Sequence, residues 1–361
     1  MSSPYRRKRT GTLPLVDIQK EAHKIAFYPL LFQAVRCLGS LGILQELATR
    51  GAGGATREDV GKLAGLSGYA VSLLLETAEA LEIIKEEEGI YTLTRLGHYL
   101  ATDTSVQINM SFTHHLCYQG AFALDTSLQK GTPEGLKHFG DWPTIYEGLA
   151  QLPDAARKSW FDFDNHYSDL LFDKAVKIVL QGQPQRVFDL GGNTGKFDLA
   201  LLQADPMVTA ALFDLPPQLK TARQTLAEHG LESRATFHAI DVLKDEEQLP
   251  KGADVIWMSQ FLDCFTEDQI VSILTKVRLA STPETRVFIL EPFVDGQHSG
   301  TQLALLAISL YFTCMANGNS RFYKKTVMEG LIRSAGLRIA REYPNMGPSN
   351  YTLLECQIVT G

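Results

Sequence analysis

The second half of the chain alternates short apolar strands with helical stretches, and this alternation limits the fold more than any other feature. From residue 185 onward we expect five buried strands, Arg186–Leu190, Ala210–Asp214, Ala235–Asp241, Asp254–Ser259 and Thr285–Glu291. Strands that alternate with helices form a parallel, doubly wound sheet covered on both faces. A last β-rich run, Tyr351–Thr360, is expected to add an antiparallel strand. The predicted fold class is therefore α/β and Rossmann-like.

A glycine-rich turn follows the first of these strands. It reads Asp189-Leu190-Gly191-Gly192-Asn193-Thr194-Gly195 and opens the next helix. Glycine lets the backbone come close to a ligand and take positive φ. A dinucleotide loop of the pattern G-x-G-x-x-G would suit a pyrophosphate. Here an acid precedes the glycines, which suits a cationic group and would repel phosphate.

Acids also end the second and third strands, at Asp214 and Asp241. A carboxylate in this position can accept hydrogen bonds from ribose hydroxyls, and the crevice at the carboxyl ends of such strands is where ligands bind. Each acid taken singly could be a helix cap. Three in register predict a cofactor site, which Leu215, Val242 and Ser259 are also expected to line.

The N-terminal region has a different pattern. Residues 17–50 carry helical periodicity, a helix start is expected at Thr56, and two β-prone runs within residues 83–94 flank a turn. Helices followed by a hairpin are the order of a winged helix. The third helix, Ser67–Leu81, contains Glu76 and Glu79 and no Lys or Arg, which favours dimerisation over DNA binding. The basic run Arg6–Arg9 is interpreted as a solvated tail rather than a nucleic-acid arm.

Residues 106–180 are expected to be mostly helical and are rich in aromatic and polar side chains, among them His115, Phe163 and His166. Two interpretations stay open. The segment is either a helical connector with buried aromatic rings or the roof of an aromatic pocket, and one helix face can serve both purposes.

Composition narrows the partners and the compartment. The formal net charge of −7 argues against nucleic acid. Five dispersed cysteines without a C-x-x-C pair fit a reducing, cytoplasmic environment. We expect no signal peptide, no metal site and no apolar run long enough to span a membrane. The longest apolar stretch, around Leu303–Met315, is expected to be a buried helix.

The chain resembles the small-molecule O-methyltransferases that include the plant caffeic-acid and acetylserotonin enzymes and bacterial antibiotic-pathway relatives. The family loop D-x-G-G-G-x-G appears at residues 189–195, its D-L-P at Asp214–Pro216, and its third acid at Asp241. The resemblance covers most of the chain. It implies S-adenosylmethionine as cofactor, a homodimer and a small aromatic acceptor. It also implies a winged-helix dimerisation domain (1–105), a connector and pocket roof (106–180) and a cofactor-binding domain (181–361).

The catalytic segment departs from the family pattern. Where relatives have L-H-D-W-x-D-E, this chain has Leu262-Asp263-Cys264-Phe265-Thr266-Glu267-Asp268. Asp263 therefore stands at the place of the family's histidine base. The resemblance keeps Glu291 as the residue that orients the base, and a second family glutamate aligns with Lys325. Phe312 and Met315 fall where the family lines its acceptor site.

This departure leaves several readings of the chemistry. Asp263 is the base, or His166 or His115 takes that role, or an ionisable phenol needs little help; otherwise Asp263 is a plain N-cap of a helix over Thr266–Ala280. O-methylation of a phenol-type metabolite is the leading prediction, with methylation of a phenol ring carbon as the alternative. Cofactor binding without methyl transfer and a winged-helix transcription regulator are the other two classes.

Overall fold

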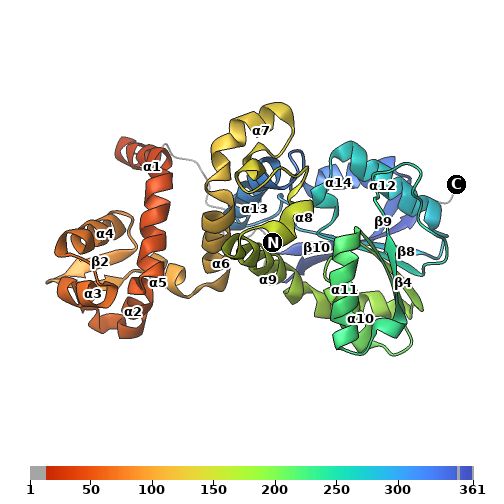
Figure 1. Ribbon diagram of the computed structural model, residues 1–361, viewed down its shortest axis with the longest axis horizontal. Helices are drawn as coiled ribbons and strands as arrows, with labels where there is room; N and C mark the ends of the chain where they lie inside the picture. The colour runs from red at the N-terminus through yellow and green to blue at the C-terminus, as the bar shows by residue number, and fades with distance from the viewer. Residues whose placement is uncertain (1–13, 348–349, 360–361) are drawn as a thin grey trace. The chain divides into compact units, whose positions relative to one another are not determined.

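The structure is a computed structural model that describes residues 14–347 and 350–359. It divides into two compact units, residues 1–114 and residues 115–361 (Figure 1). The basic run Arg6–Arg9, which the sequence assigns to a solvated tail, lies outside the described residues.

The N-terminal unit combines helices with a small antiparallel sheet. Its elements are α1 (Leu15–Ser40), α2 (Ile43–Arg50), β1 (Ala55–Thr56), α3 (Arg57–Ala64), α4 (Gly68–Ala80), β2 (Ile84–Glu87), β3 (Ile90–Leu93), α5 (Arg95–Thr102) and α6 (Thr104–Phe112). The predicted hairpin is confirmed as β2 and β3, and β1 pairs with the outer side of β3. Thr56 begins α3 through a capping box with Asp59, as the sequence predicts.

The C-terminal unit contains the doubly wound sheet. Its helices are α7 (Leu124–Lys130), α8 (Ile145–Gly148), α9 (Asp154–Val179), α10 (Lys196–Ala204), α11 (Pro216–Glu228), α12 (Glu267–Ala280), α13 (Ser299–Tyr311) and α14 (Lys325–Ser334). Its strands are β4 (Arg186–Leu190), β5 (Thr209–Asp214), β6 (Ala235–Ala239), β7 (Val255–Ser259), β8 (Arg286–Glu291), β9 (Leu337–Met346) and β10 (Tyr351–Ile358).

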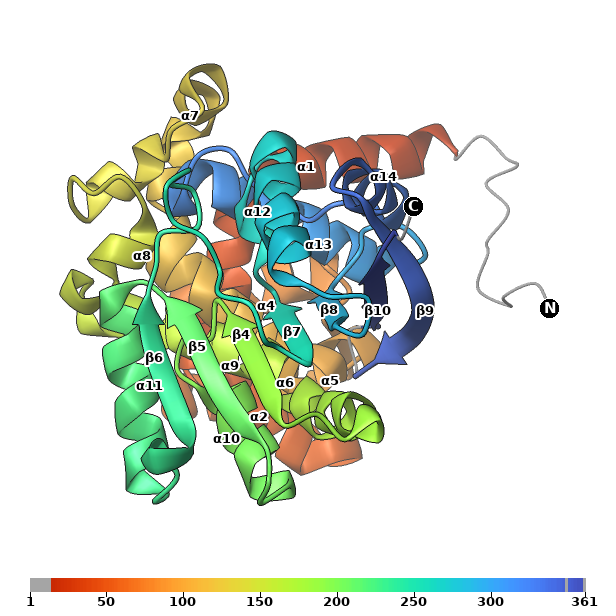
Figure 2. The same cartoon turned by 90° about the vertical axis from the view of Figure 1, so that its right-hand side faces the viewer.

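The sheet confirms the predicted topology. Within the described residues its strands lie in the order β6-β5-β4-β7-β8-β10-β9, and Figure 2 shows β6, β5, β4 and β7 side by side. The four pairings that join β6, β5, β4, β7 and β8 are parallel, and β10 runs antiparallel to β8. The strand β9, which pairs antiparallel with β10, is not among the sequence predictions. Its alternation is interrupted by exposed charged residues, so it lacks the apolar pattern of the other strands.

Apolar side chains on both faces of the sheet form two buried cores. One core joins Val187, Leu212 and Trp257 to α9, α10 and α11, with the ring of Phe197 stacked on Trp257 at 4.2 Å between centroids. The other core lies on the opposite face of the sheet, where Phe188, Ile256 and Ile289 pack against α12 and α14. A parallel sheet needs cover on both faces, which explains the nearly continuous apolar composition of these strands.

The order of the strands creates a switch point between β4 and β7. The chain proceeds from β4 outward to β6, and then returns to the other side of β4 as β7 and β8. In open α/β sheets, ligands bind at such a point, beyond the carboxyl ends of the strands. The glycine turn after β4 and the segment after β7 therefore meet at one edge of the sheet.

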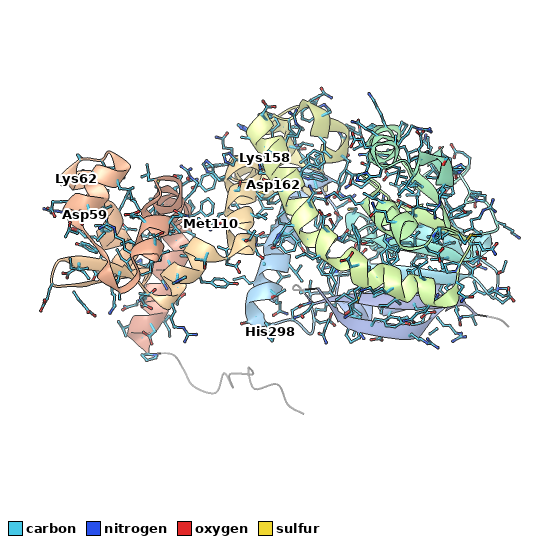
Figure 3. All side chains as sticks on the ribbon, turned by 90° about the horizontal axis from the view of Figure 1, so that it is seen from below. Asp59, Lys62, Met110, Lys158, Asp162 and His298 are labelled. Carbon is cyan, nitrogen blue, oxygen red and sulfur yellow. The ribbon has the colours of Figure 1, made fainter. Side chains whose placement is uncertain are left out.

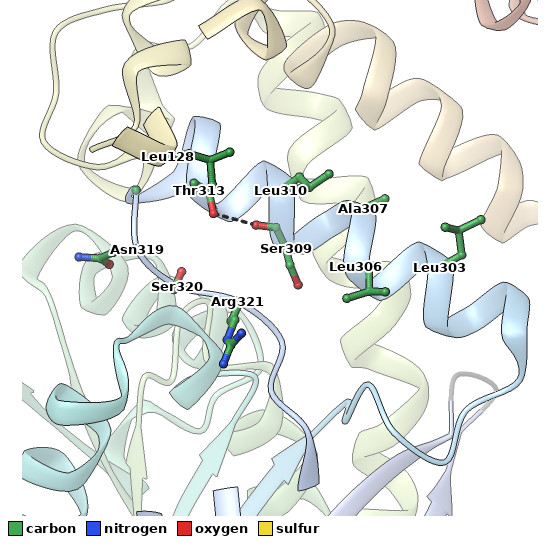
Figure 4. A pocket seen from close by; sticks show the side chains of 11 residues that line it. Leu128, Leu303, Leu306, Ala307, Ser309, Leu310, Thr313, Asn319, Ser320 and Arg321 are labelled. Carbon is green, nitrogen blue, oxygen red and sulfur yellow. Dashed lines mark hydrogen bonds between the residues drawn. The ribbon is translucent and has the colours of Figure 1, made fainter. Parts of the chain in front are cut away.

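Helix α13 corrects one expectation about membranes. A π-helical turn (Phe312–Ala316) continues α13. Together they form an 18-residue helical segment, Ser299–Ala316, that is long and apolar enough to cross a membrane. The bent pair Leu15–Ser40 and Ile43–Gly53 would count as a second such segment. Core helices of soluble proteins meet the same criterion. Only a third of the α13 segment is buried, and Leu303, Leu306 and Leu310 line an apolar groove along it (Figure 4).

The start of α12 excludes the N-cap interpretation of Asp263. The N-cap is Thr266, whose hydroxyl accepts from the Gln269 N–H at 3.3 Å while the Gln269 side chain accepts from the Thr266 N–H at 2.9 Å. Asp263 lies three residues earlier, in the 3-10 turn Leu262–Cys264. Its carboxyl is therefore not used to begin the helix.

We predict that Thr266→Ala lowers the free energy of unfolding of the C-terminal unit by about 1 kcal/mol, because it removes the cap of α12. Thr266→Ser keeps the hydroxyl and is the matched control. The urea midpoint can be followed by tryptophan fluorescence, since all three tryptophans, Trp142, Trp160 and Trp257, belong to this unit. Equal midpoints for the Ala and Ser variants would contradict the assigned cap.

Candidate active site

The glycine turn after β4 packs directly against the segment after β7. Gly191 has φ +78°, and its N–H donates to the Phe213 carbonyl at 2.9 Å. A Cβ on Gly191 would lie 2.3 Å from the ring of Phe261. A Cβ on Gly195, at φ +74°, would lie 3.0 Å from Cβ of Ala222 on α11. Both glycines are thus required by conformation and by close packing.

Asp214 holds the tip of this turn. One carboxylate oxygen accepts the Asn193 N–H at 2.8 Å, and the other accepts the Leu215 N–H at 2.7 Å. Neither bond caps a helix, because the N-cap of α11 is Leu215. Asn193 has φ +46°, a left-handed conformation that asparagine tolerates better than most residues. An asparagine therefore replaces the family glycine without changing the path of the turn.

A second carboxyl lies beside Asp189. Asp189 is 3% exposed, and Asp198, on the first turn of α10, is fully buried next to it. Burial and the neighbouring Asp198 raise the pKa of Asp189, and burial raises the pKa of Asp198 to about 7. Two adjacent carboxyls in an apolar interior do not both ionise near neutral pH, so the pair retains a proton.

The remaining predicted cofactor residues lie at the same edge of the sheet. Asp241 follows β6, and its carboxylate accepts the Leu243 N–H at 3.1 Å. Val242 is partly buried, and its carbonyl accepts from the Lys276 ammonium at 2.9 Å. Ser259 ends β7, and its hydroxyl is buried with no hydrogen-bond partner among the described residues.

These residues fit a cofactor that carries hydroxyls and positive charge. An ionised carboxylate offers about four acceptor positions, and Asp214 uses two of them on the backbone. The unpartnered Ser259 hydroxyl is a further polar group for a ligand to satisfy. Among the described residues, no Lys or Arg side chain donates a hydrogen bond to the backbone of this turn. The turn therefore has no cation bonded to its backbone that would suit a phosphate. Lys196 instead pairs with Asp169 at 2.7 Å.

The segment after β7 places Asp263 in a buried site. Asp263 is 4% exposed, and the Cys264 thiol lies 3.4 Å from its carboxyl. Glu291, at the end of β8, is 2% exposed and fixes the segment, because one of its oxygens accepts the Phe261 N–H at 3.1 Å and the Leu262 N–H at 2.9 Å. Its other oxygen, Oε2, has no hydrogen-bond partner in the part of the chain that the structure describes.

Burial changes the acidity of this group of carboxyls. It raises the pKa of Asp263 to about 7 and that of Asp164, on α9, to about 6. Burial and the charge of Asp263 also raise the pKa of Glu291. An aspartate that titrates near pH 7 has the acidity that suits a general base under physiological conditions.

Neutral polar groups surround the same carboxyls. The Tyr146 hydroxyl lies 3.1 Å from the Cys264 thiol, and the Asn317 amide donates to the Cys264 carbonyl at 2.7 Å. The indole of Trp160 donates to the Tyr311 hydroxyl at 3.0 Å. Burial raises the pKa values of Tyr146 and Tyr311 well above their usual range, so both hydroxyls stay protonated.

The two candidate histidines lie on other elements. His166 is partly buried on α9, with its ring perpendicular to Tyr167 at 5.1 Å between centroids. His115 is exposed and lies in the π-helical turn Thr113–Cys117. Neither is among the hydrogen-bond partners of Asp263 in the described residues. Their catalytic and substrate roles stay predictions.

The predicted aromatic and sulfur contacts lie mainly in packed regions. Phe163 is partly buried on α9, 4.9 Å from Tyr167 between ring centroids. Phe312 packs edge-to-face on Phe322, and Met315 is fully buried against Gly120, at which a Cβ would meet its sulfur. A substrate contact for these three residues also stays a prediction.

Lys325, which aligns with the second family glutamate, is engaged by other carboxylates. It begins α14, and its ammonium pairs with Glu342 and, at 3.5 Å, with Glu329. The nearby residue that reaches the catalytic segment is Tyr323, whose hydroxyl donates to the Phe265 carbonyl at 2.6 Å.

Sequence reasoning did not single out Asp164, Asp198, Tyr146 or Asn317. The first two carry a signal that sequence reasoning could have used. Asp164 interrupts the aromatic face of α9, and Asp198 occupies an apolar position beside Phe197 and Leu201 on α10. An acid on the buried side of an amphipathic helix is unusual enough to indicate a partner or a ligand.

Comparison with known proteins identifies the family. Residues 134–338 match the O-methyltransferase domain, and residues 19–91 match the Dimerisation2-like domain. The chain belongs to the O-methyltransferase family. The cofactor is accordingly S-adenosylmethionine. The residues at the carboxyl ends of β4, β5 and β6 remain the predicted site for it.

Three relatives illustrate the range of this family. The chain is 26% identical to the L-tyrosine C(3)-methyltransferase of Streptomyces lavendulae over 331 residues, which cover 91% of this chain and 88% of the relative. The mitomycin 7-O-methyltransferase MmcR shares its fold, with a TM-score of 0.72, 19% identity and coverage of 97% and 100%. The O-methyltransferase NcsB1, solved with S-adenosylmethionine and 2-hydroxy-5-methyl naphthoic acid, has a TM-score of 0.65, 20% identity and coverage of 91% and 96%.

We predict that Asp214→Ala weakens S-adenosylmethionine binding by about 1.5–3 kcal/mol, roughly 10- to 150-fold in Kd, because it removes a charged acceptor and frees the turn. Asp254→Ala is the matched control. Asp254 also accepts two backbone N–H groups, from Gln185 and Arg186 at 2.8 and 2.9 Å, but at the opposite end of the sheet. Calorimetry that shows equal affinity for both variants would remove Asp214 from the cofactor site.

Proposed function

We propose that this methyltransferase transfers a methyl group to a small phenolic metabolite, with Asp263 as the base that accepts the phenol proton. The observation that carries the proposal is the Asp263 carboxyl. It is buried after β7, is not a helix cap, and stands where relatives have their base. S-adenosylmethionine, when bound, supplies a methyl group activated by the neighbouring sulfonium.

The chain's own residues divide the work as follows. The turn Gly191–Gly195 and Asp214 hold the cofactor against the switch point. Glu291 fixes Phe261 and Leu262 through their N–H groups, and so positions the following Asp263. Asp263 takes the proton from the acceptor hydroxyl as the oxygen gains nucleophilicity. The close packing of both segments supports catalysis by proximity, which supplies much of the acceleration in such displacements.

O-methylation is the leading form of this proposal, since the matched domain is an O-methyltransferase domain. Methylation of a ring carbon is the second candidate, favoured by the resemblance to an L-tyrosine C(3)-methyltransferase over most of both chains. Deprotonation of a phenol activates its oxygen and the adjacent ring carbons, so one base serves either outcome. L-tyrosine is therefore the first acceptor to test with ¹³C-methyl-labelled cofactor. The ¹³C spectrum separates a methoxy from an aryl-methyl product.

Asp263→Asn is expected to lower kcat by roughly 10²–10⁴-fold, the usual worth of a general base, and to leave cofactor affinity unchanged. The pKa of Asp263 is about 7, so the base is protonated at lower pH and wild-type kcat should be low there. Wild-type kcat should then increase as the pH is raised through about 7. The variant should lack this limb.

Asp268→Asn is the control for this test, because Asp268 is an exposed aspartate in the first turn of α12. Near-wild-type turnover of Asp263→Asn would exclude Asp263 as the base and direct attention to His166 and His115. A rate that rises toward the phenol's own pKa in both proteins would indicate that the phenol ionises unaided.

We also infer a homodimer in the cytoplasm. Support comes from the match to a dimerisation domain and from exposed apolar side chains on α1, which include Leu15, Ile25 and Leu30. The groove along α13 adds a second apolar surface of the kind that subunit contacts cover. All five cysteines are free thiols, which supports a reducing compartment.

For the dimer, multi-angle light scattering at micromolar concentration should give twice the mass of the chain, in keeping with the commonest closed symmetry of soluble oligomers. Leu30→Glu should shift the population toward monomer, because a charge would replace an apolar side chain that is 69% exposed in the single chain. A wild-type monomer would contradict the inference.

A further inference from the structure

Three carboxyls of the proposed acceptor region have no ion-pair contact among the described residues, although the charge of Lys196 acts on Asp164 from nearby. Asp164 accepts from the Asn193 amide at 3.1 Å, Asp263 is approached by a thiol, and Glu291 is bonded by backbone N–H groups. Across residues 14–347 and 350–359, no Lys, Arg or His forms an ion pair with any of them. Buried carboxyls are normally paired or they lose their charge.

Two further observations indicate that a ligand completes this group. Oε2 of Glu291 has no hydrogen-bond partner within residues 14–347 and 350–359, although the residue is only 2% exposed. Asp164 is partly buried on the face of α9 that contacts the glycine turn, where its neighbour Asn165 accepts from Lys196 at 2.7 Å. The ammonium of Lys196 is itself engaged with Asn165 and Asp169, so it does not neutralise Asp164 by contact.

The carboxyls have separable tasks under the proposed function. Asp263 is the base for the phenol, and one oxygen of Glu291 accepts hydrogen bonds from the backbone of the catalytic segment. Asp164 has neither task. It is bonded to the tip of the glycine turn at Asn193, and its charge acts on Asp263. It is therefore the carboxyl that is available to a charged group of the acceptor.

We propose that the acceptor is a phenol that carries a protonated amine, and that Asp164, held by Asn193, is the residue that binds this amine. This inference rests on the proposed function for the position of the acceptor. It goes further by naming the charge class of the acceptor and a specificity-determining residue outside the catalytic segment. An ammonium would give the group of carboxyls the cation that the protein does not provide.

The amine that Asp164 binds has two possible sources, since the cofactor also carries an ammonium. The arrangement favours the acceptor, because Asp189 and Asp214 already supply carboxyls at the cofactor turn, whereas Asp164 acts electrostatically on Asp263. An experiment with the cofactor product bound separates the two sources.

The test is equilibrium binding to the full-length enzyme saturated with S-adenosylhomocysteine. The probes are tyramine, 4-propylphenol and 3-(4-hydroxyphenyl)propionate, which share a phenol and differ in charge. We expect tyramine to bind at least tenfold more tightly than 4-propylphenol, and the anion to bind most weakly, as a charge-assisted hydrogen bond to a carboxylate requires. No turnover is needed, so a failure of methyl transfer would not affect this result.

Variants assign the preference to a residue. Asp164→Asn should reduce the ratio of tyramine to 4-propylphenol affinity to about one, while the affinities for 4-propylphenol and S-adenosylhomocysteine change less than threefold. Asn193→Gly keeps the backbone bond to Asp214 and removes the amide that holds Asp164, so it should lower the ratio in part. Asp162→Asn is the control, because Asp162 is on the same helix but pairs with Lys158 one turn away (Figure 3).

Several outcomes would overturn the proposal. These are a wild-type enzyme that binds the neutral or anionic phenol as tightly as tyramine, no tyramine binding at millimolar concentration, and an Asp164→Asn variant that keeps the preference. If Asp164→Asn weakens S-adenosylhomocysteine instead of tyramine, the carboxylate serves the cofactor's ammonium and the assignment to the acceptor is wrong.

Discussion

The close approach at Gly191 is the constraint on which the site depends. At this residue the end of β4 bonds to the end of β5, and the ring of Phe261, from the segment after β7, occupies the space that a Cβ would fill. Segments from both sides of the switch point are thereby brought together, because Gly191 has no side chain to displace the Phe261 ring. Gly191, in the glycine turn, contacts Phe261, which stands two residues before Asp263. Under the proposed function, one packed unit would therefore position both reactants. A methyl transfer that gains mainly from proximity needs this arrangement.

Burial then determines what the carboxyls can do. An aspartate in water titrates near 4 and is a poor base for a phenol. In this interior the pKa of Asp263 is about 7, because the charged form is desolvated and faces the charge of Asp164. The same desolvation would be destabilising for any acid with no partner. The structure accepts this cost at Asp164, Asp263 and Glu291 together, which is typical of groups whose partner arrives with a ligand.

The sequence predicted the framework well because it depends on local patterns. Strand ends such as Leu190 and Ser259, the capping box at Thr56 and the β2–β3 hairpin follow from periodicity and turn chemistry, which act over a few residues. The alternative reading of Asp263 as an N-cap was wrong for a local reason, because Thr266 and Gln269 form the cap three residues later. Other predictions were incomplete where distant residues decide. Asp164 and Asp198 gain their meaning from contacts with the turn and with Asp189, which spacing along the chain does not reveal.

Asn193 stands where the family loop has a glycine, and it connects the glycine turn to both Asp214 and Asp164. A glycine would take the left-handed conformation at this position with less strain, so asparagine gives up some conformational ease. Its backbone N–H keeps the bond to Asp214, while its side chain adds a bond to Asp164 that a glycine lacks. The added bond fixes a carboxyl on α9 beside the glycine turn, at the boundary that we propose between cofactor and acceptor. The departures from the family pattern at positions 193 and 263 thus both concern carboxyls. Asn193, in place of a glycine, positions the carboxyl of Asp164, and Asp263 is itself a carboxyl in place of a histidine.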